Sequence, residues 1–234
     1  MRRLASAEFP ALPSITRVEA AIGRLLGLHV YVGAACVGFY IDDPGAAEVR
    51  RTFDVDVAVA VTNESDRVRL DDKLRQAGLV HDFAGPICRW TLDGLIVDVM
   101  PTDSAILGFA NRWYSLALSG AEEVQIEGMT IPIPHVCTFL ATKIEAFDGR
   151  GEGDFIMSSD FEDLVRVLDG CSFILSDSSA APSEVTSFLS ERFLAWLDSR
   201  AFQDGLAAHL LEEVGGRDRS KLVLERIAGL IAVA

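Results

Sequence analysis

The segment Thr52–Val61, with the sequence TFDVDVAVAV, constrains the fold of this 234-residue chain more than any other part of it. Its alternation of residue types has the period of a β-strand. One face of that strand is apolar and consists of Phe53, Val55, Val57, Val59 and Val61. The opposite face holds Asp54 and Asp56, although aspartate is disfavoured in strands. Either this face is exposed to water, or its two carboxylates point at one metal ion.

A third acid, Asp98, lies inside another apolar segment, Leu95–Met100. If the two strands are neighbours in one sheet, three carboxylates converge. Such a group binds Mg²⁺, which prefers oxygen ligands and shares its coordination shell with substrate phosphates. Two such ions can stabilise the attacking and leaving oxygens in phosphoryl transfer. The sequence therefore favours Asp54, Asp56 and Asp98 as metal ligands.

A turn of small residues precedes the aspartate strand by about twenty positions. The predicted strand His29–Val32 leads into Gly33, and Ala34 and Ala35 follow. A turn of this kind allows backbone N–H groups to approach a triphosphate. We therefore interpret it as a phosphate-binding turn ahead of a metal site.

The rest of the pattern predicts an α/β core over residues 1–133 and a helical region over residues 134–234. The core is expected to hold a helix that a capping box opens at Thr16. It is also expected to hold two hairpins, one with strands Ile87–Leu92 and Leu95–Met100 around Asp93–Gly94 and one around Glu127–Gly128. Helices are expected at Ser65–Gln76, His135–Phe147, Ser159–Asp169, Pro182–Leu197, Phe202–Glu213 and Asp218–Ala232. A capping box with Ser159 as its cap is expected to open the third of them.

Gly33, Asp54, Asp56 and Asp98 together resemble the signature of the nucleotidyltransferase fold in the DNA polymerase beta superfamily. That signature is a strand, a glycine turn, a D-x-D strand and a third acid on a further strand. The segment Arg50–Asp56 is similar to the R-x-T-x-D-[IV]-D motif of nucleotidyltransferases of the AbiEii/AbiGii toxin type. The resemblance is therefore to one branch of the superfamily.

The second half of the chain extends this resemblance as far as Gly170. Leu140–Phe147 resembles the L-x-x-K-x-x-A helix of the toxin-type family, with Lys143 as the lysine. The R…D…[KS]-D-x-x-D-[IL] segment that follows in the family is matched by Arg150, Asp154 and Ser159–Leu164.

The resemblance implies an α/β nucleotidyltransferase fold with a mixed β-sheet. It also implies Mg²⁺-dependent transfer of a nucleoside monophosphate from an NTP to an acceptor hydroxyl. Asp54, Asp56 and Asp98 would hold metal, and Asp98 is also a candidate base. The residues expected to contact the nucleotide are Gly33, Ala34, Arg50 and Thr52. Ala34 departs from the family, which usually has Gly or Ser there, and it has no hydroxyl to offer a phosphate.

Two charged residues of the helical region have alternative roles. Lys143 is either a surface lysine whose stem covers apolar residues or a cation that contacts the triphosphate. Asp160 is either a helix N-terminal acid stabilised by the helix dipole or a catalytic member of the site. The resemblance favours the catalytic role for both, with Asp163 holding Lys143 or Arg150 in place.

The resemblance also implies a bacterial toxin with tRNA as acceptor and a cognate antitoxin protein as partner. The net charge of −14, from 21 Lys and Arg against 35 Asp and Glu, excludes a generally basic nucleic-acid-binding surface. An acidic surface suits a cationic small substrate, such as an aminoglycoside, better than RNA. A third alternative is an inactive member that binds a nucleotide or a partner protein, and Ala34 supports it.

The four cysteines are far apart and the four histidines lack metal-ligand spacing. We therefore expect reduced core thiols and no zinc site. No signal peptide is visible, and no apolar segment is long enough to span a bilayer. These features predict a cytoplasmic protein that does not associate with membranes.

Overall fold

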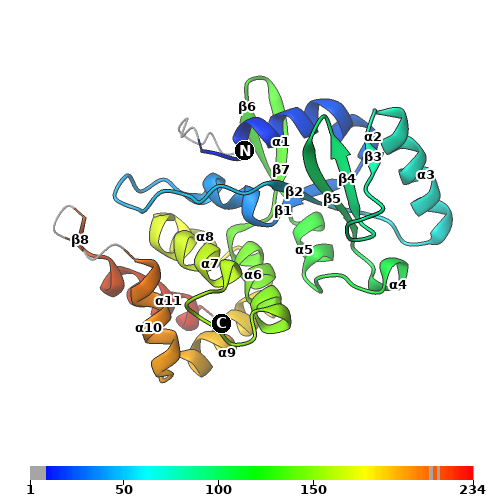
Figure 1. Ribbon diagram of the computed structural model, residues 1–234. Coiled ribbons are helices and arrows are strands. Elements are labelled where there is room, and N and C mark those ends of the chain that lie inside the picture. Colours follow the sequence, from blue (N-terminus) through cyan, green and yellow to red (C-terminus); the bar gives the residue numbers. More distant parts are fainter. Residues whose placement is uncertain (1–8, 211–212, 215–216, 234) are drawn as a thin grey trace. The chain divides into compact units, whose positions relative to one another are not determined.

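The computed structural model describes residues 9–210, 213–214 and 217–233 (Figure 1). The chain divides into two compact units. The first, the sheet unit, runs through Gly38 and then from Arg50 to Pro134. The second, the helical unit, takes the inserted segment Phe39–Val49 and the chain from His135 onward.

The sheet unit begins with one continuous helical stretch. It consists of α1 (Leu12–Val18), a π-helical turn (Glu19–Gly23) and α2 (Arg24–Leu26). The capping box predicted at Thr16 is wrong, because Thr16 lies within α1 and not at its start. Its hydroxyl donates to the carbonyl oxygen of Leu12, one turn earlier (3.1 Å). Pro13 lies in the first turn, where a missing backbone N–H leaves no helical hydrogen bond unmade.

Five strands of this unit form one sheet (Figure 1). They are β1 (His29–Val32), β2 (Asp54–Val59), β3 (Val80–His81), β4 (Arg89–Leu92) and β5 (Leu95–Pro101). Their order is β1-β2-β5-β4-β3, with β2 and β5 parallel and the other neighbours antiparallel. The predicted α/β class with a mixed sheet is confirmed. The other helices of the unit are a 3₁₀-helix that starts at Ala34, α3 (Glu64–Gln76), α4 (Ser104–Leu107) and α5 (Tyr114–Ser119).

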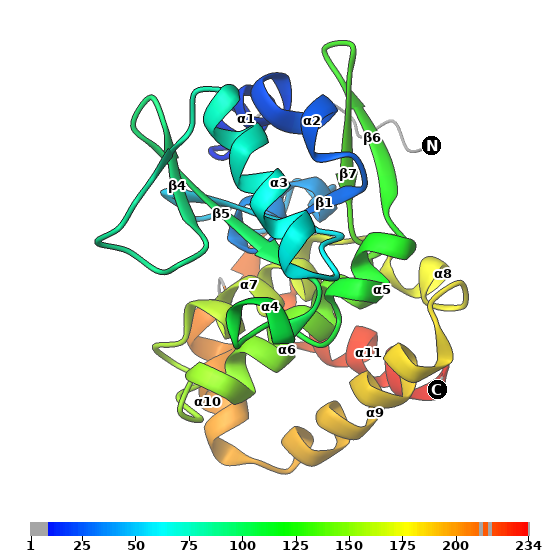
Figure 2. The same cartoon turned by 90° about the vertical axis from the view of Figure 1, so that its right-hand side faces the viewer.

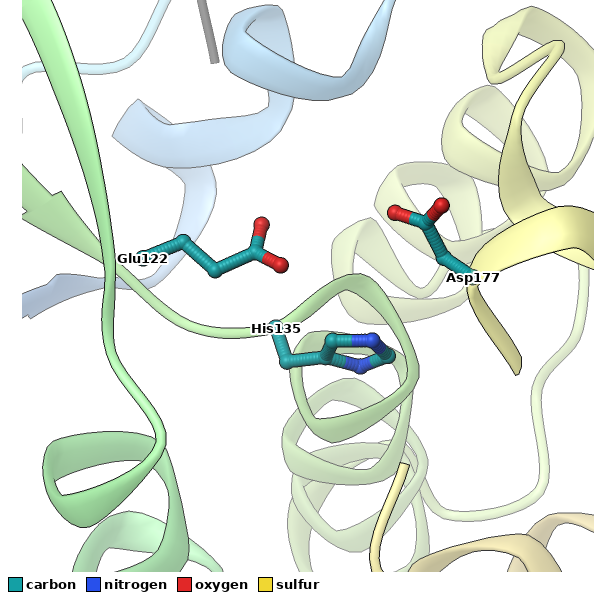
Figure 3. A group of neighbouring side chains, drawn as sticks. All are labelled: Glu122, His135 and Asp177. Carbon is teal, nitrogen blue, oxygen red and sulfur yellow. The ribbon is translucent and has the colours of Figure 1, made fainter. Parts of the chain in front are cut away.

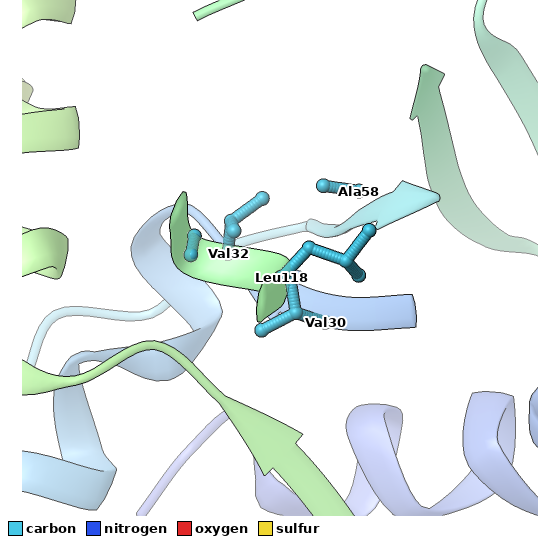
Figure 4. Packing of buried hydrophobic residues seen from close by; sticks show 5 residues of the cluster. Val30, Val32, Ala58 and Leu118 are labelled. Carbon is cyan, nitrogen blue, oxygen red and sulfur yellow. The ribbon is translucent and has the colours of Figure 1, made fainter. Parts of the chain in front are cut away.

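The aspartate face of β2 becomes apolar towards the end of the strand. Two residues after Asp56, Ala58 is fully buried in a small cluster to which α5 contributes (Figure 4). The other members of this cluster are Val30, Val32, Ala117 and Leu118. Asp54 and Asp56 lie outside the cluster and are half-buried. One face of β2 therefore combines a packed end with a polar end.

Two strand boundaries predicted from the sequence are wrong. β2 begins at Asp54, so Phe53 lies before its first ladder pair and is 85% exposed instead of sharing the buried face. β4 begins at Arg89 rather than at Ile87, because the Arg89 backbone N–H closes a turn onto the carbonyl oxygen of Pro86 (2.8 Å).

Both predicted hairpin turns are confirmed. The central residues all have positive φ: +46° and +85° at Asp93 and Gly94, and +50° and +82° at Glu127 and Gly128. Two positive values in a row are the geometry of the tight turn that matches the twist of a hairpin. The second hairpin consists of β6 (Glu122–Ile126) and β7 (Met129–Ile133) (Figure 2).

The helical unit is confirmed as predominantly helical. Its helices are α6 (Val136–Arg150), α7 (Ser159–Gly170), α8 (Ile174–Ser178), α9 (Ser183–Leu197), α10 (Arg200–His209) and α11 (Arg219–Ala232). A short ladder pairs β8 (Glu213–Val214) with β9 (Arg217–Asp218). α6 is buried over most of its length because α7, α8 and α9 pack against it. Aromatic rings that contact one another fill the core of this unit. They belong to Phe147, Phe155, Phe161, Trp196 and Phe202.

Two helix boundaries predicted here are wrong. The residue that caps α7 is Ser158 rather than Ser159, and its hydroxyl accepts a hydrogen bond from the Phe161 N–H (3.4 Å). α10 ends at His209, and Glu213, which was expected to end it, lies in β8.

The inserted segment Phe39–Val49 is fixed in the helical unit by a buried arginine. Arg219 is 1% exposed and donates from Nε to Oδ1 of Asp169 (2.6 Å) and from Nη1 to Oδ2 of Asp43 (2.8 Å). A buried guanidinium is tolerated only when such partners satisfy it. The backbone N–H groups of Asp42 and Asp43 also donate to the carbonyl oxygen of Gly170 (3.0 Å).

No helix in the described part of the chain has the length and apolarity needed to cross a membrane. The four cysteines are buried thiols.

One buried ionic cluster in the sheet unit links stability to pH. Oε2 of Glu19 accepts hydrogen bonds from Nε2 of His29 (2.9 Å) and from the hydroxyl of Tyr31 (2.9 Å). Nδ1 of His29 lies 2.8 Å from the carbonyl oxygen of Gly27. Burial alone lowers the pKa of His29, but the hydrogen bonds to Glu19 and Gly27 outweigh it and raise the pKa above 6.5. Because both ring nitrogens face oxygens, the folded chain favours the protonated ring more than water does.

We predict that His29 stabilises the fold most below pH 6.5 and progressively less as the pH rises through its elevated folded-state pKa. In urea unfolding, His29→Gln should therefore cost about 2 kcal/mol at pH 5.5 and clearly less at pH 9. His81→Gln, at a half-buried histidine in the same unit, is the control. A cost for His29→Gln that does not change with pH would contradict the prediction.

Candidate active site

The register of β2 and β5 brings the three predicted carboxylates together. Asp56 pairs directly with Asp98 across the parallel ladder, and Asp54 lies two positions earlier on the same face of β2. One oxygen from each residue can be chosen so that all three lie within 4.8 Å of one another. Asp98 is 7% exposed, and the other two are half-buried. The predicted convergence of Asp54, Asp56 and Asp98 is therefore present within the sheet unit.

Gly33 is required next to this carboxylate group for two reasons. It follows β1, whose last residue, Val32, pairs with Asp56, and it has a φ of +70° that disfavours other residues. A Cβ at this position would lie 1.9 Å from Oδ2 of Asp56. The backbone at Gly33 thus lies so close to the Asp56 carboxylate that a residue with a Cβ would not fit there. Ala34 follows as the first residue of the 3₁₀-helix.

Thr52 and Arg50 precede the aspartates in the chain. The Thr52 hydroxyl donates to Oδ1 of Asp54 (2.6 Å) and so orients that carboxylate. Thr52 and Arg50 are both half-buried. The structure thus gives Thr52 a positioning contact with a proposed metal ligand, a role that the sequence did not indicate.

Arg89 is the residue of this site that the sequence analysis missed. From β4 it donates through Nε to Oδ1 of Asp98 (2.9 Å) and through Nη2 to Oδ2 (2.7 Å). The pair is directly opposed in the antiparallel ladder. The hydrogen bonds to Asp98 raise the pKa of Arg89 still further above its usual value. The sequence contains the information needed to find Arg89. A two-residue turn at Asp93–Gly94 fixes the strand register, and that register places Arg89 opposite Asp98.

The donor set of this site fits Mg²⁺. Asp54, Asp56 and Asp98 provide only carboxylate oxygens, which are the ligands this ion prefers. Burial together with the charges of Asp98 and Asp56 raises the pKa of the Cys88 thiol to about 11. The charged groups that this site offers to a metal ion are its three carboxylates.

Lys143 and Asp160 lie in the helical unit and pair with each other. Lys143, in α6, is 4% exposed, and its Nζ lies 3.2 Å from Oδ1 of Asp160 and 2.7 Å from Oδ2 of Asp163. The alternative of a surface lysine is therefore wrong, and the expected contact of Asp163 with Lys143 is confirmed. The catalytic role of Lys143 and Asp160 stays a prediction from the resemblance.

Arg150 completes the charge balance around Asp160. It donates from Nε to Oδ2 (2.7 Å) and from Nη2 to Oδ1 (3.0 Å) of that residue. Burial raises the pKa of Asp160, but the hydrogen bonds and charges of Arg150 and Lys143 outweigh it and hold the pKa below its usual value. Asp160 is thus an ionised acid with two cationic partners, at the edge of a pocket of about 320 Å³.

His135 has a structural position in the helical unit. It is the N-cap of α6, and its Nδ1 accepts a hydrogen bond from the Cys137 backbone N–H (3.2 Å). Figure 3 shows the His135 ring at the start of this helix. This contact satisfies one of the N–H groups that the first turn of a helix leaves without an intrahelical partner.

Comparison with known proteins identifies a related fold. No family model and no curated protein matches the chain. Among solved structures, the chain is similar to an antigenic nucleotidyltransferase-like protein from Paracoccidioides brasiliensis. The two share 17% sequence identity at a TM-score of 0.51, over 89% of this chain and 97% of the other. The chain therefore has a nucleotidyltransferase-like fold.

We predict that Gly33→Ala destabilises the protein more than Gly94→Ala. Both positions have positive φ, but a Cβ at Gly94 would meet nothing within 4 Å, whereas one at Gly33 would collide with Asp56. Gly94→Ala should cost about 1–2 kcal/mol of backbone strain, and Gly33→Ala about 3 kcal/mol or more. Urea unfolding of the two variants measures this difference. Equal costs would show that the backbone at Gly33 does not constrain Asp56.

Proposed function

We propose that this protein is a Mg²⁺-dependent nucleotidyltransferase that moves a nucleoside monophosphate from an NTP to an acceptor hydroxyl. The observation that supports this best is the group of Asp54, Asp56 and Asp98, whose oxygens approach within 4.8 Å beside the turn at Gly33. The nucleotidyltransferase-like fold of the chain is consistent with it.

The proposal gives each residue of the sheet unit a defined task. Asp54 and Asp56 hold the metal, and the Thr52 hydroxyl orients Asp54 through its 2.6 Å hydrogen bond. Bound Mg²⁺ supplies charge neutralisation for the triphosphate and for the departing pyrophosphate. Asp98 is proposed to complete the metal site from β5, and each of its oxygens also accepts a hydrogen bond from Arg89.

The turn at Gly33 and Ala34 is proposed to hold the phosphates through backbone N–H groups. Ala34 has no hydroxyl, so this contact depends on the backbone alone. Arg50 is proposed to assist, since a guanidinium matches phosphate oxygens in geometry and charge.

Two acceptors are proposed for this chemistry. The resemblance to the AbiEii/AbiGii toxin type supports the 3′ end of tRNA, together with a toxin role and an antitoxin partner. The net charge of −14 instead favours a cationic hydroxylated molecule such as an aminoglycoside. The same charge disfavours broad electrostatic attraction to RNA, so binding of tRNA would depend on local contacts.

We predict Mg²⁺-dependent transfer of label from an α-labelled NTP to one of these acceptors. Purified protein is incubated with total bacterial tRNA, or with an aminoglycoside panel, and each NTP in turn. Asp56→Asn should lower the rate at least about 100-fold, because it removes a charged ligand from the metal site. Removal of Mg²⁺ with EDTA should have the same effect.

The matched control is Asp93→Asn, which removes an exposed aspartate from the hairpin turn of the same sheet. It should leave the rate within about twofold of the wild type. NTP binding without transfer to any acceptor would favour an inactive, nucleotide-binding protein. Transfer that Asp56→Asn does not reduce would contradict the proposed site.

A further inference from the structure

We propose that Arg89 is a built-in counter-ion that competes with the metal ion for Asp98 and thereby sets the metal affinity of the site. This inference rests on the proposed function, because it assumes that Asp54, Asp56 and Asp98 hold a divalent cation. Arg89 acts through Asp98 and is a positioning residue.

Arg89 engages Asp98 from β4 through both carboxylate oxygens. Both oxygens of Asp98 accept a hydrogen bond from the planar guanidinium, at 2.9 Å and 2.7 Å. This two-pronged pairing is the strongest arrangement available to an arginine and a carboxylate. The side chains are only 25% and 10% exposed, so water screens the pair weakly.

The surrounding chain holds Arg89 in this position. Asp98 lies opposite it in the ladder, and the backbone of Arg89 is fixed on both sides by hydrogen bonds to Pro86 (2.8 Å) and Asp82 (3.0 Å). A Cβ at Gly85 would lie 2.7 Å from Cδ of Arg89, so the loop leaves room for the arginine stem only because residue 85 is glycine.

Electrostatics explains why the site needs this cation when no metal is bound. Three carboxylates with oxygens within 4.8 Å of one another repel each other, and Asp98 is 7% exposed. The Arg89 guanidinium offsets one of the three charges. When a divalent cation arrives, the same guanidinium repels it and occupies oxygens that the cation would otherwise coordinate. Arg89 therefore stabilises the metal-free site and weakens metal binding.

The test is calorimetric titration with Mn²⁺, together with thermal unfolding with and without Mn²⁺. Arg89→Gln should bind Mn²⁺ about tenfold more tightly than the wild type. It should also have a lower Tm without metal and a larger rise in Tm on adding it. Arg17→Gln is the control, because Arg17 pairs with Asp93 in the hairpin turn of the same sheet, and it should bind Mn²⁺ like the wild type.

Arg89→Lys provides a second variant if Arg89→Gln does not fold. It keeps the positive charge on a flexible stem without the two-pronged geometry, so its affinity should lie between those of the wild type and Arg89→Gln. Mn²⁺ binding by both Arg89 variants that equals or falls below that of the wild type would overturn the role of Arg89 and leave the metal site standing. If neither the wild type nor any variant binds Mn²⁺, the metal site itself and the competition for it are both contradicted.

Discussion

The parallel pairing of β2 with β5 is the constraint on which the sheet unit depends. It places two like charges, Asp56 and Asp98, side by side in one ladder, which is unfavourable unless something compensates it. One neighbour leaves space for the pair and another compensates its charge. Gly33 leaves the space that the Asp56 carboxylate occupies, and Arg89 pairs with Asp98 from the next strand. A sheet that only needed stability would place apolar residues there, so this costly arrangement points to function.

In the helical unit, too, buried charged side chains have partners of opposite charge. Lys143 pairs with Asp160 and Asp163, and Arg219 pairs with Asp169 and with Asp43 of the inserted segment. Removing one member of such a group leaves a buried charge without its partner, which typically costs 3–5 kcal/mol. These pairs therefore specify which segments pack together, and they tie a segment far earlier in the chain to the C-terminal helices.

The sequence predicted the parts of the fold that local patterns determine. The alternating valines predicted β2, and the paired turn residues predicted both hairpins. The D-x-D spacing together with Asp98 predicted the carboxylate group. Its errors have physical causes. Thr16 lies inside a helix that begins earlier, at Leu12, with Pro13 in its first turn, and Ser158 caps α7 although Ser159 is an equally suitable residue type. The inserted segment could not be predicted, since its packing depends on Arg219, which lies about 175 residues later. Arg89 could have been found from the hairpin register.

The central claim is that Asp54, Asp56 and Asp98 bind a divalent cation, and anomalous diffraction from crystals soaked in Mn²⁺ tests it most directly. The account predicts an anomalous peak within about 2.3 Å of oxygens of Asp54 and Asp56, and no such peak in Asp56→Asn crystals. A peak confined to other acidic surfaces, such as the exposed face of α3, or one that persists in Asp56→Asn, would contradict it.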